Sequence, residues 1–231
     1  MKKKILFLTA LLSFFLLAGC FSPEDISAWE ASDVLSKVKE AVAELSEQEA
    51  IHTIEKTVMT YPEGADTITI ERWYVGGNCL YVTEQENGIT ATGLQYNGEN
   101  FLKVSTNNEW MQTKQPSALA PVGAKQGAAQ LLSEENLLSW ETVNGEYCVI
   151  FNDLPKEADG QQVYKESKTA YYFNTKWELL RVENHAEFSM ESWADGSVND
   201  SITDMTVEYQ DTSAKRVKNK IEDAYKEATG E

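Results

Sequence analysis

Side chains that most enzymes and metal sites depend on are scarce in this sequence. Its 231 residues include two histidines and three cysteines. His52 and His185 each stand in an expected strand, and neither has a second ligand at a metal-site or catalytic-triad spacing. A GxSxG nucleophile motif is absent as well. The sequence therefore predicts no metal ion, no cofactor and no enzymatic activity, and a surface or cross-strand role for both histidines.

Basic residues are also few. The 20 Lys and Arg residues face 37 Asp and Glu residues, which gives a net charge of −17. Such a chain repels phosphate backbones, and this excludes nucleic acid as a partner. The segment Asp195–Asp200 looks like a calcium loop, but Ile202 stands where the last ligand of such a loop would be Glu. We therefore interpret the segment as a hairpin connection.

The sequence contains only one long apolar run, and it lies at the N-terminus. Three lysines precede an oily stretch over Ile5–Leu17, and Ala18 and Gly19 lead into Cys20. A transmembrane helix needs about 18 or more apolar residues, and this run falls short of that length. A basic start, a short apolar core and small residues before a processing point are typical of a secretory signal peptide, here residues 1–19.

The residues Leu17-Ala18-Gly19-Cys20 resemble the lipobox of bacterial lipoproteins. The resemblance implies a mature chain that begins at a lipidated Cys20, with palmitate as the expected acyl type, anchored on the extracytoplasmic side of the bacterial cell membrane. Loss of residues 1–19 removes three lysines and leaves 212 residues with a net charge of −20. At this length about 70% of the unfolded surface can be buried, enough for one large β domain or two small ones.

Two further cysteines, Cys79 and Cys148, both stand in expected strands. Two alternatives remain open for them. They form one disulfide, which closes a loop of about 70 residues and contributes on the order of 4 kcal/mol, or they are two buried thiols. No CxxC motif or Cys/His cluster indicates a redox or metal site.

Amphipathic helices are expected on both sides of the strand region. After a lipidated tether over 20–31, Ser32 is the expected N-cap of a helix that ends at Ser46. A second helix is expected over 213–228. Its lysines and arginine gather near its start and oppose the helix macrodipole, so it should fray unless it docks or unless this basic cluster meets an anion. The two apolar stripes consist of Val34, Leu35, Val38, Ala41, Val42 and Leu45, and of Val217, Ile221, Ala224, Tyr225 and Ala228.

Between these helices the apolar period is two, and each short run is followed directly by turn residues. Such spacing is typical of an antiparallel meander, because parallel strands need longer crossovers. The pattern breaks between Pro116 and Trp140, where we expect a lid or crossover with short helices at Ala128–Leu132 and Ser133–Leu138. The expected strands are Ile51 onward, Thr67–Val75, Cys79–Val82, Ile89–Tyr96, Asn100–Ser105, Trp110–Thr113, Tyr147–Asn152, Val163–Phe173, Glu178–Met190 and Ser201–Tyr209.

Six tryptophans stand along the chain. Trp29 lies in the tether, where its ring is suited to lipid headgroups. The other five lie on or beside strands and either pack in the core and across strands or line an apolar cavity. They are Trp73, Trp110, Trp140, Trp177 and Trp193.

An anchored Cys20, an amphipathic helix and meandering strands, in this order, resemble lipoprotein-carrier domains of the LolA/LolB and LppX/LprG type. The segments Asn97–Val104 and Ala170–Glu183 look like two hairpins of that family. The resemblance, which spans roughly Ser32 to Tyr209, implies one mainly β (α+β) domain over 32–231. Its fold would be a curved antiparallel unclosed β-barrel covered by an N-terminal amphipathic helix, short central helices and a C-terminal helix. No ligand-contacting residue of the family maps onto a specific position here.

Two functions follow from this fold. In the first, the concave face of the half-barrel binds a lipid or another hydrophobic ligand, which exchanges with the covering helices. In the second, side chains fill the concave face, and the domain is an interaction or sensing module for an envelope protein. A hydrolase would instead need a cluster of titratable groups in a cleft.

Overall fold

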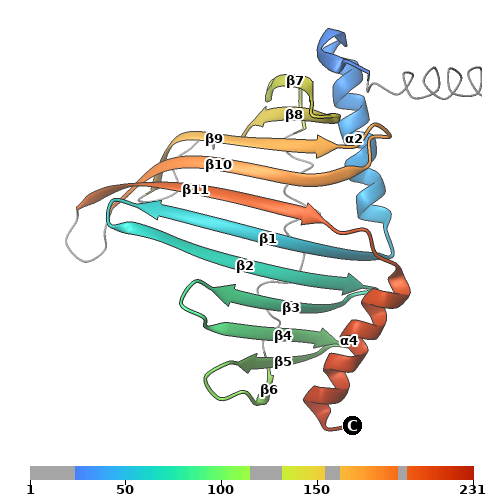
Figure 1. Ribbon diagram of the computed structural model, residues 1–231, viewed down its shortest axis with the longest axis vertical. Helices are drawn as coiled ribbons and strands as arrows, with labels where there is room; N and C mark the ends of the chain where they lie inside the picture. The colour runs from blue at the N-terminus through green and yellow to red at the C-terminus, as the bar shows by residue number, and fades with distance from the viewer. Residues whose placement is uncertain (1–23, 115–131, 154–161, 192–196) are drawn as a thin grey trace, which may run out of the picture.

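The computed structural model describes residues 24–114, 132–153, 162–191 and 197–231 (Figure 1). It contains a short 3-10 helix, η1 (Ile26–Ala28), and two α-helices, α2 (Ala31–Glu47) and α4 (Ala214–Thr229). The strands are β1 (Ala50–Tyr61), β2 (Gly64–Val75), β3 (Asn78–Gln85), β4 (Thr90–Tyr96), β5 (Glu99–Val104), β6 (Trp110–Thr113), β7 (Leu137–Val143), β8 (Glu146–Asn152), β9 (Gln162–Phe173), β10 (Leu179–Glu191) and β11 (Val198–Tyr209).

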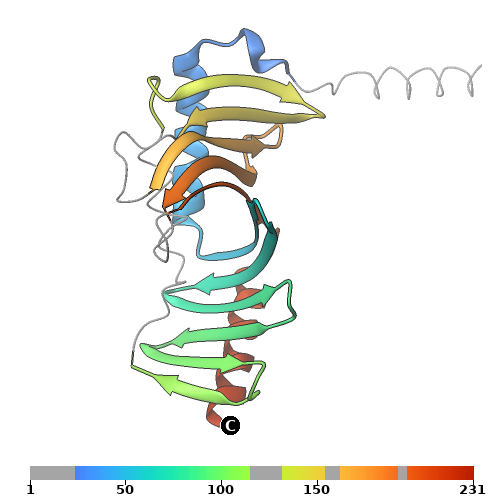
Figure 2. The ribbon, with the colours of Figure 1, turned by 90° about the vertical axis from the view of Figure 1, so that its left-hand side faces the viewer.

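All of these strands belong to one antiparallel sheet. Its order is β6-β5-β4-β3-β2-β1-β11-β10-β9-β8-β7. Two meanders, β1 to β6 and β7 to β11, therefore meet where β1 pairs with β11. The edges β6 and β7 lie at opposite ends of the sheet, which is curved and stays open (Figures 1 and 2). The predicted unclosed antiparallel barrel is confirmed, and the chain crosses from one edge to the other between Thr113 and Leu137.

The register separates the two faces of the sheet. Trp73 of β2 pairs with His52 of β1, and following the pairs onward places Glu208 and Arg181 on the same face as Trp73. Helix α4 packs on this face, which we call the α4 face. The residues of opposite parity, such as Tyr171 and Val149, form the other face, where α2 packs, and we call it the α2 face.

Helix α2 closes one core against β7 to β10. Its stripe is buried, and Val34 and Val38 are fully enclosed. The opposing strands supply a row of large side chains, among them Phe151 and Phe173. The helix begins at Ala31 with Glu30 as its N-cap, so the predicted cap at Ser32 is wrong. The segment that precedes α2 in the chain is also part of the folded domain, because η1 packs on β7 and Ile26 is completely buried.

Helix α4 closes a second core on the opposite face, over β2 to β5. Ser213 caps it by accepting a hydrogen bond from the Arg216 N–H, and Gly230 ends it in the left-handed conformation. Val217 and Ile221 are buried against Trp73, Leu80 and Leu94. The predicted apolar stripe therefore docks, which offsets the unfavourable placement of the charges along the helix.

The predicted short central helices are not borne out where the structure describes that stretch. Ser133–Asn136 forms a turn, and Leu137 and Leu138 begin strand β7. The strand was missed because Leu137, Leu138 and the turn-forming Ser133 also fit a helix start. The signal for a strand is at its end, where the β-branched residues Thr142 and Val143 directly precede the hairpin turn Asn144-Gly145. Most of the other predicted helix, Ala128–Leu132, lies outside the described residues.

Cys79 and Cys148 are two free, buried thiols rather than a disulfide. Cys79 lies on β3 and Cys148 on β8, with five strands between them. The register also places them on opposite faces of the sheet. A disulfide needs Cα atoms within about 7 Å, so these two positions are incompatible with one. Burial raises the pKa of Cys79 to about 11 and also raises the pKa of Cys148, which keeps both thiols protonated at neutral pH.

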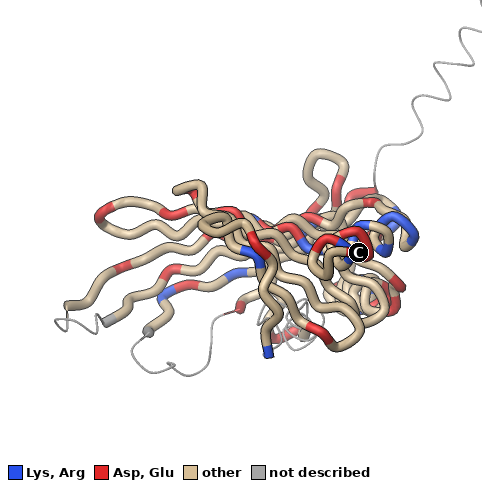
Figure 3. Tube along the Cα trace, turned by 90° about the horizontal axis from the view of Figure 1, so that it is seen from below, with Lys and Arg blue, Asp and Glu red and all other residues tan. Residues whose placement is uncertain are grey.

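Acidic residues are spread over strands and turns, with basic residues between them (Figure 3). Among the described residues, no helix is both long enough and apolar enough to cross a membrane.

Candidate functional site

The α2 face contains a cavity that α2 does not fill. Its volume is about 260 Å³, and its lining residues come from the ends of β8 to β11 that lie away from the helix. One cross-strand row of small side chains creates the space, because Ser167, Ala186 and Thr203 lie opposite one another on neighbouring strands. The full lining is Asp153, Tyr164, Ser167, Asn184, Ala186, Phe188 and Thr203.

A hydrogen-bonded carboxylate forms the polar side of this cavity. Asp153 directly follows β8, and its backbone N–H donates to the Ser167 carbonyl oxygen at 2.9 Å. Its Oδ2 accepts hydrogen bonds from Thr169 Oγ1 and Asn184 Nδ2, both at 2.9 Å. Asn184 Nδ2 also lies 3.2 Å from the Lys168 carbonyl oxygen, which fixes the amide in place. The carboxyl oxygen Oδ2 thus accepts hydrogen bonds from two side-chain donors.

An aromatic pair forms the apolar side of the cavity. The rings of Tyr164 on β9 and Phe188 on β10 lie 5.7 Å apart between centroids. Ala186 lies beside Phe188 along the same face and is buried. The cavity therefore combines an aromatic wall with a carboxylate and hydroxyl groups, an arrangement suited to an amphipathic molecule.

Two tyrosines, Tyr171, which is buried, and Tyr209, which is half-buried, adjoin this region. Burial raises the pKa of Tyr171, and the nearby Tyr209 and Asp153 raise it further. Burial alone raises the pKa of Tyr209 to about 12. Both phenols therefore stay neutral at physiological pH and add hydrogen-bonding groups without charge to the α2 face.

The centre of the α2 face holds an ion pair. Arg72 Nη1 lies 2.7 Å from Glu55 Oε2, and the two side chains are only 15% and 18% exposed. An unbroken apolar hollow would not contain such a pair, because two charges are costly to remove from water. The α2 face is thus polar in part.

Comparison with known proteins gives only distant similarities. No protein-family model matches the chain, and no curated protein matches it. One similar crystal structure is an outer membrane lipoprotein-sorting protein domain from Vibrio parahaemolyticus, which is 12% identical over 83% of this chain and 99% of that chain, with a TM-score of 0.30.

Two further solved structures are similar to the same degree. A DUF1329 family protein from Desulfovibrio piger is 9% identical over 78% of this chain and 91% of that chain, with a TM-score of 0.29. The MucA/MucB complex of Pseudomonas aeruginosa matches at 12% identity over 81% of this chain and 96% of that chain, also with a TM-score of 0.29. Similarities this distant carry no argument, so the description of the fold depends on the sheet and helices above.

The tryptophans that the structure describes pack in the two cores and do not line the cavity. Trp29, predicted to rest on lipid headgroups, packs against Trp177 with ring centroids 5.7 Å apart. Together with Trp140 they flank the core under α2, while Trp73 and Trp110 belong to the core under α4. Trp193 and the start of the calcium-like loop at Asp195 lie outside the described residues.

No cavity residue was predicted from the sequence. The available signal was the run of small side chains on one face of three consecutive strands, from Ser167 and Thr169 through Ala186 to Ser201 and Thr203. Small residues at buried strand positions leave space that large residues would fill. Recognising the signal requires the register between strands, which the sequence does not state.

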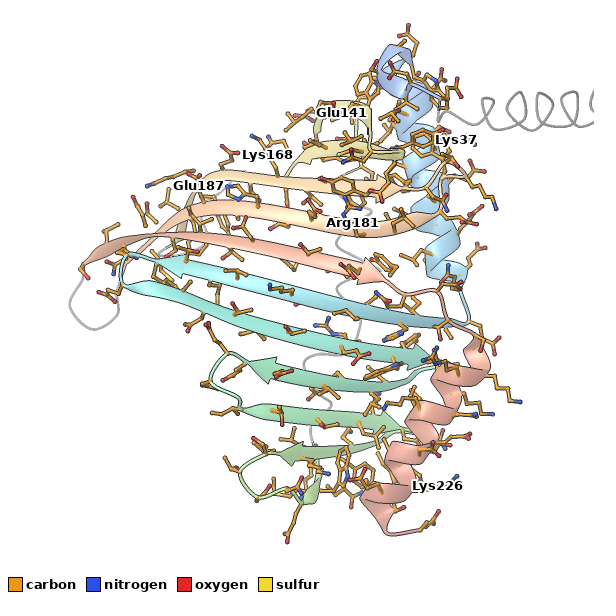
Figure 4. The ribbon with its side chains drawn as sticks, in the orientation of Figure 1. Lys37, Glu141, Lys168, Arg181, Glu187 and Lys226 are labelled. Atoms are coloured by element: carbon orange, nitrogen blue, oxygen red, sulfur yellow. The ribbon has the colours of Figure 1, made fainter. Side chains whose placement is uncertain are left out.

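Both histidines lie on the α4 face in cross-strand pairs, as predicted. His52 Nε2 lies 2.8 Å from Glu71 Oε1, and the His52 ring stacks on Trp73. His185 Nδ1 lies 2.7 Å from Asp204 Oδ1, and its Nε2 lies 3.5 Å from Glu187 Oε1 (Figure 4). Among the described residues, no group of three His, Cys, Asp or Glu side chains could hold a metal ion.

Stability should depend on pH through His185. The hydrogen bond to Asp204 raises the pKa of His185, and the negative charges of Asp204 and Glu187 raise it further. Partial burial of the ring lowers the pKa and so offsets part of this increase. A pKa raised by folding stabilises the fold below the unfolded pKa, and the stabilisation is lost as pH rises through the folded value. We expect His185→Gln to lose up to about 1 kcal/mol at pH 5.5 and almost nothing at pH 8.5, because the pair is exposed.

Urea unfolding of both chains at the two pH values measures this difference. His52 is present in both chains, so the comparison isolates His185. Parallel pH dependence in the two chains would show that the His185 pair does not stabilise the fold.

Proposed function

We propose that the chain is a membrane-anchored extracytoplasmic lipoprotein that binds a small amphipathic ligand in the cavity on the α2 face. The proposal includes lipidation at Cys20 and no enzymatic activity. The observation that carries it is the cavity itself, in which an aromatic wall faces the Asp153 carboxylate. Its volume of about 260 Å³ lies just below the roughly 300–1,000 Å³ of typical ligand sites. It therefore suits a small molecule or one end of a longer hydrophobic ligand.

The polar groups define the chemistry of that ligand. In the described part of the chain, Thr169 and Asn184 both donate to Oδ2 of Asp153. We therefore assign Oδ1 as the acceptor for a hydroxyl or ammonium group of the ligand. The apolar part would lie against Tyr164 and Phe188, where it loses contact with water.

Filling the cavity should abolish binding. Ala186 lies in the row of small side chains, so Ala186→Phe places a ring in the space that the ligand would occupy. Ala170→Phe is the matched control, because Ala170 lies on neighbouring β9 and its side chain belongs to the α4 face. Each protein is made in its own host and extracted with organic solvent, and the extract is analysed by mass spectrometry.

We expect a small molecule in extracts of the parent chain and of Ala170→Phe, and at least a tenfold loss in Ala186→Phe, which corresponds to about 1.4 kcal/mol of binding. Thermal unfolding of both variants separates loss of binding from loss of folding. Equal amounts of the molecule in all three extracts would contradict binding in the cavity.

A second candidate function is that of a protein-interaction module of the envelope. The observation that favours it is three exposed apolar side chains at the ends of β9, β10 and β11 that lie away from the helices, with Met190 on the α2 face and Val163 and Val198 on the α4 face. Exposed apolar side chains of this size are found at interaction sites. Absence of any small molecule from every extract would favour this function over ligand binding.

A further inference from the structure

The length of the tether fixes which end of the protein meets the membrane. Only four residue steps separate Cys20 from Glu24, and an extended chain spans at most about 3.5 Å per residue, so the anchor lies within about 14 Å of Glu24. Thr142 Oγ1 donates a hydrogen bond to the Glu24 carbonyl oxygen at 2.8 Å and accepts one from the Ile26 N–H at 3.2 Å. Glu24 is therefore fixed to β7 one residue pair from the β7–β8 turn.

Both long helices lie at this same end of the strands (Figure 1). The first two turns of α4 contain Lys215, Arg216 and Lys218, all exposed, and no acidic residue precedes Glu222 in the helix. We call these three residues the basic patch. Lys218 approaches Glu222 only at 3.7 Å. The patch is complementary to anionic phospholipid headgroups, although the mature chain as a whole is acidic.

Acidic residues nearby restrict any contact with anionic headgroups to the start of α4. Glu222, Asp223 and Glu227 follow in the same helix, and α2 exposes Glu40, Glu44 and Glu47 at the same end of the strands. Screening at physiological salt limits each charge to about 8 Å, so the patch can interact with a surface locally. Lys226, in the last turn, stands apart from it (Figure 4).

The cavity lies at a distance from this end. Leu179 begins β10 there, and Ala186, seven residues further along the strand, lines the cavity. At about 3.4 Å per residue the separation is roughly 24 Å. A ligand in the cavity would then lie away from the bilayer surface.

We propose that the strand end with η1 and the basic patch is the membrane-facing surface, that the patch contacts anionic phospholipid headgroups, and that the cavity opens away from the bilayer. This inference depends on the anchoring at Cys20 in the proposed function. It implies that ligand exchange occurs with donors in the aqueous envelope rather than directly with membrane lipid.

Fluorescent labels at two exposed positions test this orientation. Asn219→Cys places one label beside the basic patch, and Val198→Cys places the other at the start of β11, at the opposite end of the strands. Cys79 and Cys148 are each 3% exposed and stay unlabelled. The lipidated proteins are reconstituted in vesicles of phosphatidylcholine, with or without an equal amount of phosphatidylglycerol, that contain a headgroup-linked quencher.

We expect the label at position 219 to be quenched several-fold more in the anionic vesicles, and this gain to disappear at high salt or when Lys215, Arg216 and Lys218 are all changed to Glu. The label at position 198 should be quenched in neither vesicle. Stronger quenching at 198 than at 219, or no effect of the charge reversal, would overturn the proposal.

A second form of the protein separates the orientation from the anchoring. In it, a His tag replaces Cys20 and binds a nickel-chelating lipid, so the domain is held at the same point without acylation. If mass spectrometry finds no lipid on Cys20, the proposed anchor fails, while the tagged protein still decides which end faces the membrane.

Discussion

A chain that lacks Cys20 should leave the membrane. When residues 1–20 are replaced by an ordinary cleaved secretory signal followed by Ser, we expect the protein to move almost entirely from the membrane fraction to the soluble envelope fraction. Each buried CH₂ of an acyl chain contributes about 0.8 kcal/mol to membrane binding, so loss of the lipid removes most of the attachment. The basic patch contains only three side chains and cannot replace it.

Fractionation and mass spectrometry of the purified proteins measure this effect. The native protein should carry the mass of its acyl groups, and the variant should not. Cys79→Ser and Cys148→Ser are matched controls, because both thiols are buried and free, and neither substitution should change the fraction in which the protein is found. A variant that stayed in the membrane fraction would show that the domain has another attachment.

The folded domain of the released variant should be unchanged. Residues from Glu24 onward are held by β7, and Ile26 is buried in the core under α2. The released form should therefore unfold at the same temperature as the native protein in detergent. Its ligand content should also match, since the cavity lies far along the strands from Glu24, the residue next to the replaced segment that the structure describes.

The sequence was sufficient to predict the local elements of this fold. Period-two patterns identified nearly every strand, and apolar stripes identified both long helices, because these patterns reflect which side chains become buried. These features depend on residues close together in the chain.

Features that depend on pairing between distant strands could not be predicted. The contact of β1 with β11 brings together residues about 150 positions apart, and it decides that α2 and α4 lie on opposite faces. The cavity also depends on register, since Ser167, Ala186 and Thr203 form a row only when three strands align. The open question about Cys79 and Cys148 was settled in the same way, by the number of strands between them.

Gly93→Ala should strongly destabilise the fold. Gly93 lies directly opposite Tyr81, on the neighbouring strand, and the Tyr81 ring covers it. A Cβ at Gly93 would lie 2.0 Å from Cζ of that ring. Because Tyr81 is only 7% exposed, its ring can move only by disturbing the packing around it. We expect a loss of about 3 kcal/mol, at the upper end of the usual range for overpacking.

Thermal unfolding measures this loss, which corresponds to a decrease in Tm of roughly 6–12 °C for a domain of this size. Gly64→Ala is the matched control, because nothing lies within 4 Å of a Cβ there, and its effect should stay within about 0.5 kcal/mol. In a Tyr81→Ala background, Gly93→Ala should cost little, since the ring that it meets is gone. If Gly93→Ala cost the same with and without the ring, contact with Tyr81 would not be the reason for glycine at this position.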